Sequence, residues 1–288
     1  MFQIPPALNW LEQSSRGRDW LRELPARVSA CSSRWKLSLE PPFQQSFVSI
    51  VFPARLADGS PRVLKIQYPH PESEHESEAL RLWNGKGAIR LFDFDPAHHA
   101  LLLERCRPGD HLSTIGASQA LEVLVGLLPR LWVPAGVPFR SLSDEAAGWL
   151  QELPVTWDRA GQPFERELLE GALDAIARLR PTQREQVLLH QDLHGDNVLR
   201  AEREPWLVID PKPLIGEKAF SLAPIIRAYE FGHSSADVIH RLDTLSAALR
   251  VDRERARLWA LAQTLAWSFA DDHVYPRHIE TARWLWQA

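Results

Sequence analysis

The chain has 288 residues, of which 45% are hydrophobic and 24% are charged, and its formal net charge is −4. A chain of this length and composition can bury a large core, so we expect a folded protein of two lobes. Because acidic residues outnumber basic ones, we do not expect the chain to bind nucleic acid independently of its sequence.

The sequence also argues against membrane insertion and against a disulfide framework. No stretch is apolar for long enough to span a bilayer, and the first residues lack the layout of a signal peptide. Cys31 and Cys106 lie far apart and form no metal-binding or redox spacing. We therefore predict a cytoplasmic monomer with free thiols and no membrane or nucleic-acid partner.

The N-terminal third begins with helical periodicity and changes to alternation. Residues 7–30 predict one or two short helices, interrupted by Ser-Ser-Arg-Gly at 14–17. From Trp35 to Ile66 apolar side chains alternate with polar ones, which predicts three strands, the last two joined by a turn at Asp58-Gly59.

A helix and two more strands complete this lobe. Residues 72–83 predict a helix that ends at Asn84-Gly85, and strands are predicted at 89–94 and 100–106. This order indicates a small antiparallel sheet with one main helix. We place the N-terminal lobe at residues 1–106, with the boundary near Arg-Pro-Gly-Asp at 107–110.

The remainder, residues 107–288, is predicted to be mostly helical. Residues 118–132 and 165–180 have strongly amphipathic patterns, and residues 217–288 are helical by pattern. Short apolar runs at 187–189, 198–199 and 206–209 predict strands around one polar segment. The expected fold class is therefore α+β.

That polar segment runs from His190 to Asn197 and is followed, thirteen residues later, by Asp210 at the end of an apolar run. Asn and Asp oxygens are hard ligands that suit Mg²⁺ when substrate phosphates complete its shell. Asp192 would remain free to accept a proton. A base, metal ligands and a cation for the nucleotide are the parts that phosphoryl transfer requires.

Residues 187–211 resemble the catalytic segment of the aminoglycoside and antibiotic phosphotransferases, which have a bilobal protein-kinase-like fold. The runs at 83–91 and 208–217 are similar to the branch containing streptomycin 6-phosphotransferase and hydroxyurea phosphotransferase. The resemblance implies that Asp192 is the catalytic base and that Asn197 and Asp210 bind the metal. It also implies that His190 supports the loop.

The same resemblance assigns nucleotide-binding residues to the N-terminal lobe. Lys65 would neutralise phosphate charge on ATP, with Glu76 as its helix partner and Glu78 as the second choice. Backbone groups of Glu104 and Cys106 would bind adenine at a hinge. The expected phosphate-covering loop, residues 41–47, has no glycine, and Ser46 is the residue that would act through its hydroxyl and amide.

The implied activity is transfer of the γ-phosphoryl group of ATP, with Mg²⁺, to a hydroxyl of a small acceptor such as streptomycin or hydroxyurea. The N-terminal lobe would bind the nucleotide and the C-terminal lobe would carry the catalytic and acceptor sites. A cationic acceptor favours a pocket with carboxylates. The candidates are Glu145, Asp271, Asp272 and Glu280.

Three other functions remain open from the sequence. One is a metabolic sugar or amino-sugar kinase of the same fold, and another is a nucleotide-binding pseudokinase without turnover. The third is a metal-dependent hydrolase with His190, Asp192 and His194 as zinc or manganese ligands. For His194 and Asp196 we expect hydrogen bonds that brace the loop rather than a role in transfer.

Overall fold

The computed structural model describes residues 2–270 and 274–288. The chain divides into two compact units, Met1–Gly109 and Asp110–Ala288, and the division falls within the Arg-Pro-Gly-Asp segment. No helix within the described ranges combines the length and the apolar character that crossing a membrane requires.

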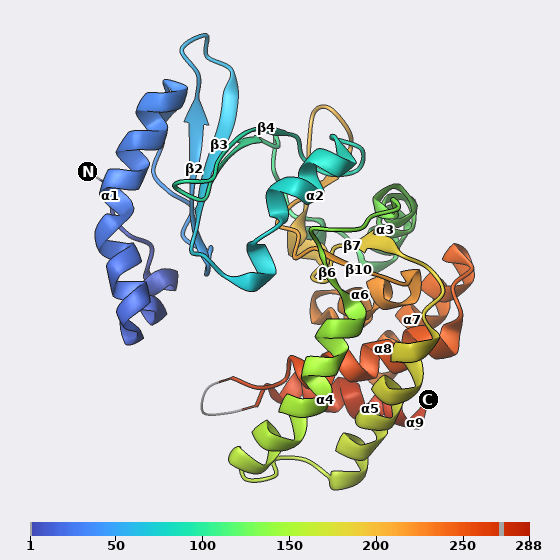
Figure 1. Cartoon of the computed structure of the whole chain (residues 1–288). Coiled ribbons are helices and arrows are strands. Elements are labelled where there is room, and N and C mark those ends of the chain that lie inside the picture. Colours follow the sequence, from blue (N-terminus) through green and yellow to red (C-terminus); the bar gives the residue numbers. More distant parts are fainter. Residues whose placement is uncertain (1, 271–273) are drawn as a thin grey trace. The chain divides into compact units, whose positions relative to one another are not determined.

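The first unit is built on an antiparallel five-stranded sheet with the strand order β1-β2-β3-β5-β4 (Figure 1). A 3₁₀ helix, η1, precedes α1, and a 3₁₀ turn, η2, precedes α2. The elements are η1 Pro6–Gln13, α1 Ser15–Trp35, β1 Ser38–Leu39, β2 Ser49–Arg55, β3 Pro61–Gln67, η2 Pro71–Ser73, α2 Glu76–Trp83, β4 Leu91–Asp95 and β5 Ala100–Glu104.

Helix α1 packs along one face of this sheet (Figure 1). Its apolar stripe, which includes Trp20, Leu24 and Val28, is buried against residues of β2 and β3 such as Leu64 and Ile66. Successive side chains of a strand point to opposite faces of the sheet, so the neighbours of Ile66 on β3 point away from α1. That alternation leaves Lys65 and Gln67 on the face opposite α1.

The interruption expected at residues 14–17 lies where η1 ends and α1 begins, so it separates these two helices and does not divide α1. Ser14 is the N-cap, and its Oγ accepts a hydrogen bond from the Gly17 backbone N at 3.0 Å. Gly17 lies so close to the preceding turn that a Cβ would be 2.1 Å from the Leu11 carbonyl oxygen. The sequence Ser-Ser-Arg-Gly is thus a helix start.

Several predicted boundaries in this unit were wrong. Trp35 ends α1 and is not the first residue of a strand; the left-handed Lys36, with φ of 52°, caps the helix. The helix predicted from residue 72 begins at Glu76, because Pro71 opens a separate 3₁₀ turn. The strands predicted at 89–94 and 100–106 pair only over 91–95 and 100–104.

The second unit is mostly helical, with two small sheets (Figure 1). Its helices are η3 Leu112–Thr114, α3 Ala117–Leu131, α4 Leu142–Arg159, α5 Arg166–Leu179, η4 Arg180–Thr182, η5 Gly195–Asn197, η6 Lys218–Leu222, α6 Ala223–Arg227, η7 Tyr229–Phe231, α7 Ser235–Leu249, α8 Arg253–Ala266 and α9 Pro276–Gln287. Its strands are β6 Arg140–Ser141, β7 Val187–Leu189, β8 Val198–Arg200, β9 Trp206–Val208 and β10 Leu214–Gly216.

Helix α8 is the central helix of this unit. It packs against α5, α6, α7 and α9, and every residue from Ala256 to Leu265 is buried. A helix that is covered on all sides belongs to the core of a large domain. Because it is fixed so firmly, α8 can hold polar side chains near its C-terminal end in a defined position.

The two small sheets hold the polar segment between short strands. Strand β7 pairs with β10, and β10 pairs with β6, whereas β8 and β9 form a separate hairpin. The segment 190–197 therefore leaves one sheet and enters the other. All the strands predicted around it from apolar runs are present.

Candidate active site

The loop from His190 to Asn197 is tied to the segment that follows β9. The imidazole Nε2 of His190 donates to the Ile209 carbonyl at 2.8 Å, and the His190 carbonyl accepts from the Lys212 backbone N at 3.1 Å. His190 is buried, and this burial lowers the pKa of its imidazole to about 4. The ring is therefore neutral and acts as a support, because both nitrogens already make hydrogen bonds.

Two residues of this region adopt left-handed backbone conformations that favour glycine. Gln191 has φ of 61° and Asp210 has φ of 54°. Each such conformation costs about 1–2 kcal/mol for a residue with a side chain. Hydrogen bonds offset this cost: the Gln191 carbonyl accepts from Gln263 Nε2 at 2.9 Å, and the His190 bonds hold the neighbouring segment.

The carboxylate of Asp192 lies beside positive charge. Lys212 Nζ is 3.2 Å from its Oδ2, and the two side chains are 26% and 18% exposed. Burial by itself would raise the pKa of Asp192, but Lys212, with smaller contributions from His194 and Arg227, holds that pKa below its ordinary value. Asp192 is thus an ionised carboxylate at neutral pH.

Arg227, at the end of α6, is a buried cation in the same region. Its NH1 donates to Gln263 Oε1 at 3.3 Å, and its guanidinium lies 4.8 Å from the centre of the Trp267 ring. Lys212 Nζ lies 4.7 Å from the centre of the same ring. Burial lowers the pKa of Arg227 to about 10, which leaves it charged at neutral pH.

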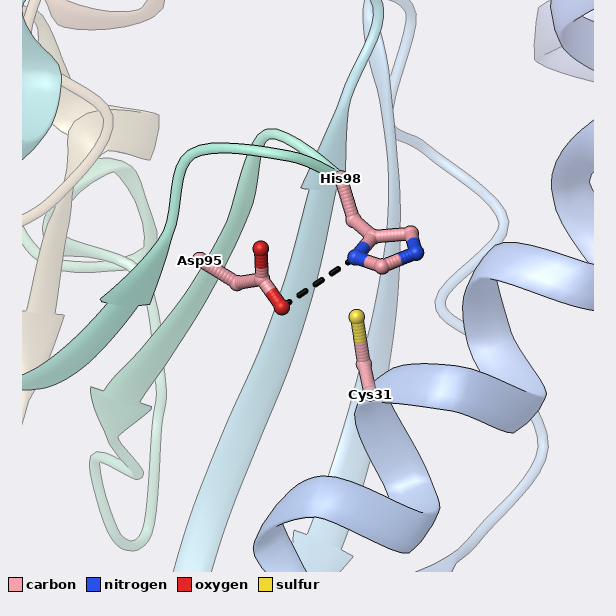
Figure 2. A group of neighbouring side chains, drawn as sticks. All are labelled: Cys31, Asp95 and His98. Atoms are coloured by element: carbon pink, nitrogen blue, oxygen red, sulfur yellow. Dashed lines mark hydrogen bonds and ion pairs between the residues drawn. The ribbon is translucent and has the colours of Figure 1, made fainter.

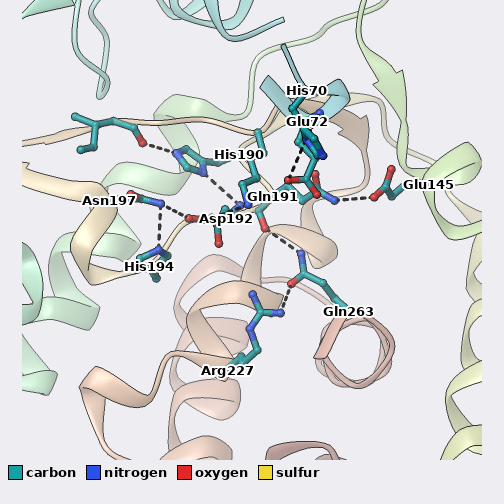
Figure 3. A network of polar contacts seen from close by, with 12 residues as sticks. His70, Glu72, Glu145, His190, Gln191, Asp192, His194, Asn197, Arg227 and Gln263 are labelled. Atoms are coloured by element: carbon teal, nitrogen blue, oxygen red, sulfur yellow. Dashed lines mark hydrogen bonds and ion pairs between the residues drawn. The ribbon is translucent and has the colours of Figure 1, made fainter. Parts of the chain in front are cut away.

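Asn197 and Asp210 carry the candidate metal-binding oxygens. Asn197 Nδ2 donates to the Asp192 carbonyl at 2.8 Å and lies 3.1 Å from His194 Nε2 (Figure 3). With its amide nitrogen engaged, the side-chain oxygen of Asn197 is the atom left to bind a cation. Asp210 lies two residues after the end of β9 and carries a carboxylate, and the side-chain oxygens of both residues are of the hard type that Mg²⁺ prefers.

His194 and Asp196 make loop-bracing hydrogen bonds of the expected kind. His194 contacts Asn197 through Nε2, and its Nδ1 accepts from the Asp196 backbone N at 3.3 Å. The Asp196 carboxylate accepts a hydrogen bond from the Ser113 hydroxyl. Glu230 adds a further tie by accepting from the Gly195 backbone N at 2.8 Å.

In the first unit, Lys65 forms an ion pair with Glu76. The Lys65 Nζ and Glu76 Oε2 atoms are 2.6 Å apart, and the side chains are 7% and 1% exposed. Gln67 Nε2, on the same face of β3, donates to the same oxygen at 2.6 Å. Glu78, the second choice from the sequence, instead bonds Ser77 and lies near His75.

Glu104, one of the two residues expected at a hinge, is the last residue of β5. The Glu104 backbone N donates to the Arg90 carbonyl at 2.9 Å, so this amide is already used within the β4–β5 pair. Any adenine contact at Glu104 must therefore come from its carbonyl, and Cys106 follows as a buried residue beyond the strand. In the glycine-free loop, Ser46 Oγ bonds Ser49 Oγ at 2.7 Å.

Of the carboxylates expected to contact an acceptor, Glu145 is connected to the loop. Its Oε1 accepts from Gln191 Nε2 at 3.3 Å (Figure 3), and its Oε2 pairs with Arg140 NH1 at 2.6 Å. Glu280 pairs with His233 at 2.8 Å. Asp271 and Asp272 lie outside the described residues.

Several site residues were not found from the sequence. Lys212 had a signal, because lysines are rare in this chain and this one stands two residues after Asp210. Arg227, Gln263 and Trp267 had none, since they come from distant helices. The hydrolase hypothesis loses its basis, because both nitrogens of His190 are engaged in hydrogen bonds.

This chain is similar to known proteins over most of its length. The family model for aminoglycoside/hydroxyurea antibiotic resistance kinases matches residues 34–272. A hydroxyurea phosphotransferase from Kitasatospora aureofaciens is 40% identical over 265 residues, which is 90% of this chain and 77% of that protein. A streptomycin 6-kinase from Streptomyces griseus is 39% identical over 256 residues, 86% of this chain and 83% of that protein.

Among solved structures, a choline kinase from Streptococcus pneumoniae superposes with a TM-score of 0.65. The match covers 93% of this chain and 100% of that one at 13% sequence identity. At this identity the likeness concerns the fold alone. The predicted α+β, protein-kinase-like fold is confirmed.

Proposed function

The chain belongs to the aminoglycoside/hydroxyurea antibiotic resistance kinase family, and from this membership we propose that it transfers the γ-phosphoryl group of ATP to a hydroxyl of streptomycin, hydroxyurea or a related acceptor. It is a phosphotransferase with an alcohol group as acceptor, like its named relatives. A metabolic sugar kinase and a pseudokinase are not favoured, because relatives near 40% identity carry antibiotic kinase names.

The observation that carries the proposal is the ionised carboxylate of Asp192 on a rigid loop. Its oxygen accepts a hydrogen bond from the acceptor hydroxyl and orients that oxygen toward the γ-phosphorus. As the new O–P bond forms and the bond to ADP breaks, the hydroxyl proton passes to Asp192. Such general-base assistance contributes about 10²–10⁴-fold to rate.

We assign the nucleotide and metal to residues of matching chemistry. Lys65, held by Glu76, contacts the α- and β-phosphates, and the Glu104 carbonyl and Cys106 backbone bind adenine. Ser46 contacts the phosphates from the glycine-free loop. Asn197 and Asp210 bind Mg²⁺, which neutralises the charge of the phosphates when it is bound.

Lys212 has two effects in this scheme. Its ammonium keeps Asp192 ionised at 3.2 Å, and its charge favours the negatively charged phosphoryl group as it moves toward the acceptor. Arg227 adds a second buried cation in the same network. In this proposal both positive charges favour the negative charge that accumulates during transfer.

The acceptor site includes Glu145, which reaches the loop through Gln191. A carboxylate here attracts a cationic acceptor such as an aminoglycoside. We further propose that the enzyme acts as a monomer in the cytoplasm. Asp271 and Asp272 stay in the proposal as additional acceptor contacts.

The test is a panel of hydroxyl acceptors screened for ATP consumption, with streptomycin, hydroxyurea and sugars included. Asp192→Asn should lower kcat by about 10²-fold or more, while ATP binding measured by calorimetry is kept. Asp196→Asn is the matched control, since it removes a charge from the same loop and keeps a hydrogen-bond partner for Ser113. Full turnover in Asp192→Asn would refute the assignment of the base.

A further inference from the structure

A cluster of three potential metal ligands lies in the first unit, and the proposed transfer chemistry does not use it. Cys31 comes from α1, Asp95 ends β4, and His98 follows in the turn between β4 and β5. One ligand atom from each residue lies within 4.8 Å of the other two. Figure 2 shows the Cys31 sulfur directed toward the hydrogen bond that joins the other two side chains.

We propose that Cys31, Asp95 and His98 bind one Zn²⁺ ion. A thiolate sulfur, an imidazole nitrogen and a carboxylate oxygen are the three donor types that zinc sites in proteins use. The identity of the donors therefore favours zinc over magnesium or calcium, which prefer sites made of oxygen alone.

The geometry fits a tetrahedral ion after a small movement of one side chain. Zn–N and Zn–O bonds of about 2.0–2.1 Å place the nitrogen and oxygen about 3.3 Å apart. His98 Nδ1 and Asp95 Oδ2 are 3.1 Å apart. The sulfur should lie about 3.6 Å from each of them. The ligand atoms lie within 4.8 Å of one another, so Cys31 has to move closer by at most about 1.2 Å, which a change of its side-chain torsion supplies.

The carboxylate is already oriented for one bond to a metal. Asp95 Oδ1 accepts a hydrogen bond from the Ala97 backbone N at 3.0 Å, which fixes the turn and leaves Oδ2 as the ligand. His98 is the partly exposed member, with 33% of its side chain accessible. Water can reach the cluster on that side and occupy the fourth position.

Arg34 is the main competitor of a metal ion. Its NH1 lies 3.8 Å from Asp95 Oδ2, but its side chain is 53% exposed, so it can turn toward solvent when a cation arrives. Displacing this charge weakens binding relative to a site with four protein ligands and no competing cation. The bound ion would connect α1 to the β4–β5 turn and stabilise the first unit.

The experiment uses the full chain after treatment with a chelator. Isothermal titration with Zn²⁺ should show one equivalent bound, and the melting temperature should rise with Zn²⁺ concentration. Co²⁺ in place of Zn²⁺ should give a thiolate-to-metal absorption band. His98→Gln should weaken Zn²⁺ binding at least tenfold and, because this residue is partly exposed, the fold should be kept.

Cys31→Ser should abolish the cobalt band, and Cys106→Ser, the matched change at the other buried cysteine, should keep it. Zinc binding with undiminished affinity in both His98→Gln and Cys31→Ser would mean that the ion binds elsewhere and would overturn the proposal. So would the absence of any binding to the wild-type chain. If Cys31→Ser proves poorly folded, the His98→Gln titration decides alone.

Discussion

The buried ion pair between Lys65 and Glu76 gives the sharpest test of how the first unit combines stability with function. In Glu76→Gln, the Lys65 ammonium loses the charge of the carboxylate 2.6 Å away, while volume and shape change little. Both side chains are more than nine-tenths buried, so solvent cannot replace the lost charge. Breaking a buried pair by removing one partner costs about 3–5 kcal/mol.

For a unit of about this size, 1 kcal/mol changes the melting temperature by about 4 °C. Glu76→Gln should therefore lower the melting temperature of the first unit by about 12–20 °C in a calorimetric scan. Glu78→Gln is the matched control on the same helix, and we expect it to change stability by less than about 0.5 kcal/mol because Glu78 is partly exposed.

The double variant Lys65→Met/Glu76→Gln separates the two roles of the pair. With both charges of the pair removed, most of the lost stability should return, but ATP turnover should stay as low as in Lys65→Met. A double variant no more stable than Glu76→Gln would show that the buried Lys65 charge beside a neutral side chain at position 76 is not the cause of the loss. The reasoning from burial would then be wrong.

Other predictions concern both units. Lys212→Gln removes the charge that does most to lower the pKa of Asp192. The pKa of Asp192 should therefore rise, and the acidic limb of the kcat/KM profile should move to higher pH; an unmoved limb would contradict this. The pKa of His190 is about 4 in the folded chain and about 6.5 in the unfolded chain. Between these two pH values the unfolded chain therefore carries a proton on His190 that the folded chain lacks. Unfolding free energy should fall below pH 6.5 by about 1.4 kcal/mol per pH unit, as measured by urea titration, and His190→Gln should flatten the slope. Gly126→Ala, in open space on α3, should stabilise the chain by about 0.5–1 kcal/mol, whereas Gly17→Ala should destabilise it because its Cβ would meet backbone; equal melting temperatures for the two variants would contradict the packing argument.

Local sequence patterns were sufficient for much of the fold. The turn at Asp58-Gly59 joins β2 and β3 as expected, because that dipeptide adopts the tight turn that a two-strand hairpin needs. The apolar runs around residues 190–197 form the predicted strands. The Lys65–Glu76 contact follows from the same alternation that puts Leu64 and Ile66 on the opposite face of β3.

Other features could not be predicted because they depend on contacts between distant segments. Arg227 and Gln263 reach the Asp192 loop from α6 and α8, and their local patterns describe only buried helices. The cluster of Cys31 with Asp95 and His98 likewise has no characteristic spacing. Helix ends were misjudged where a cap decides them, as at Lys36.

Helix α1 has a consequence for anyone who trims this protein by homology. The family match begins at residue 34, whereas α1 spans Ser15–Trp35, so nearly all of the helix precedes the shared segment. Yet α1 covers the apolar face formed by residues such as Leu64 and Ile66. A chain cut at the start of the match would expose the hydrophobic sheet surface that α1 covers, and aggregation during expression would be the expected result.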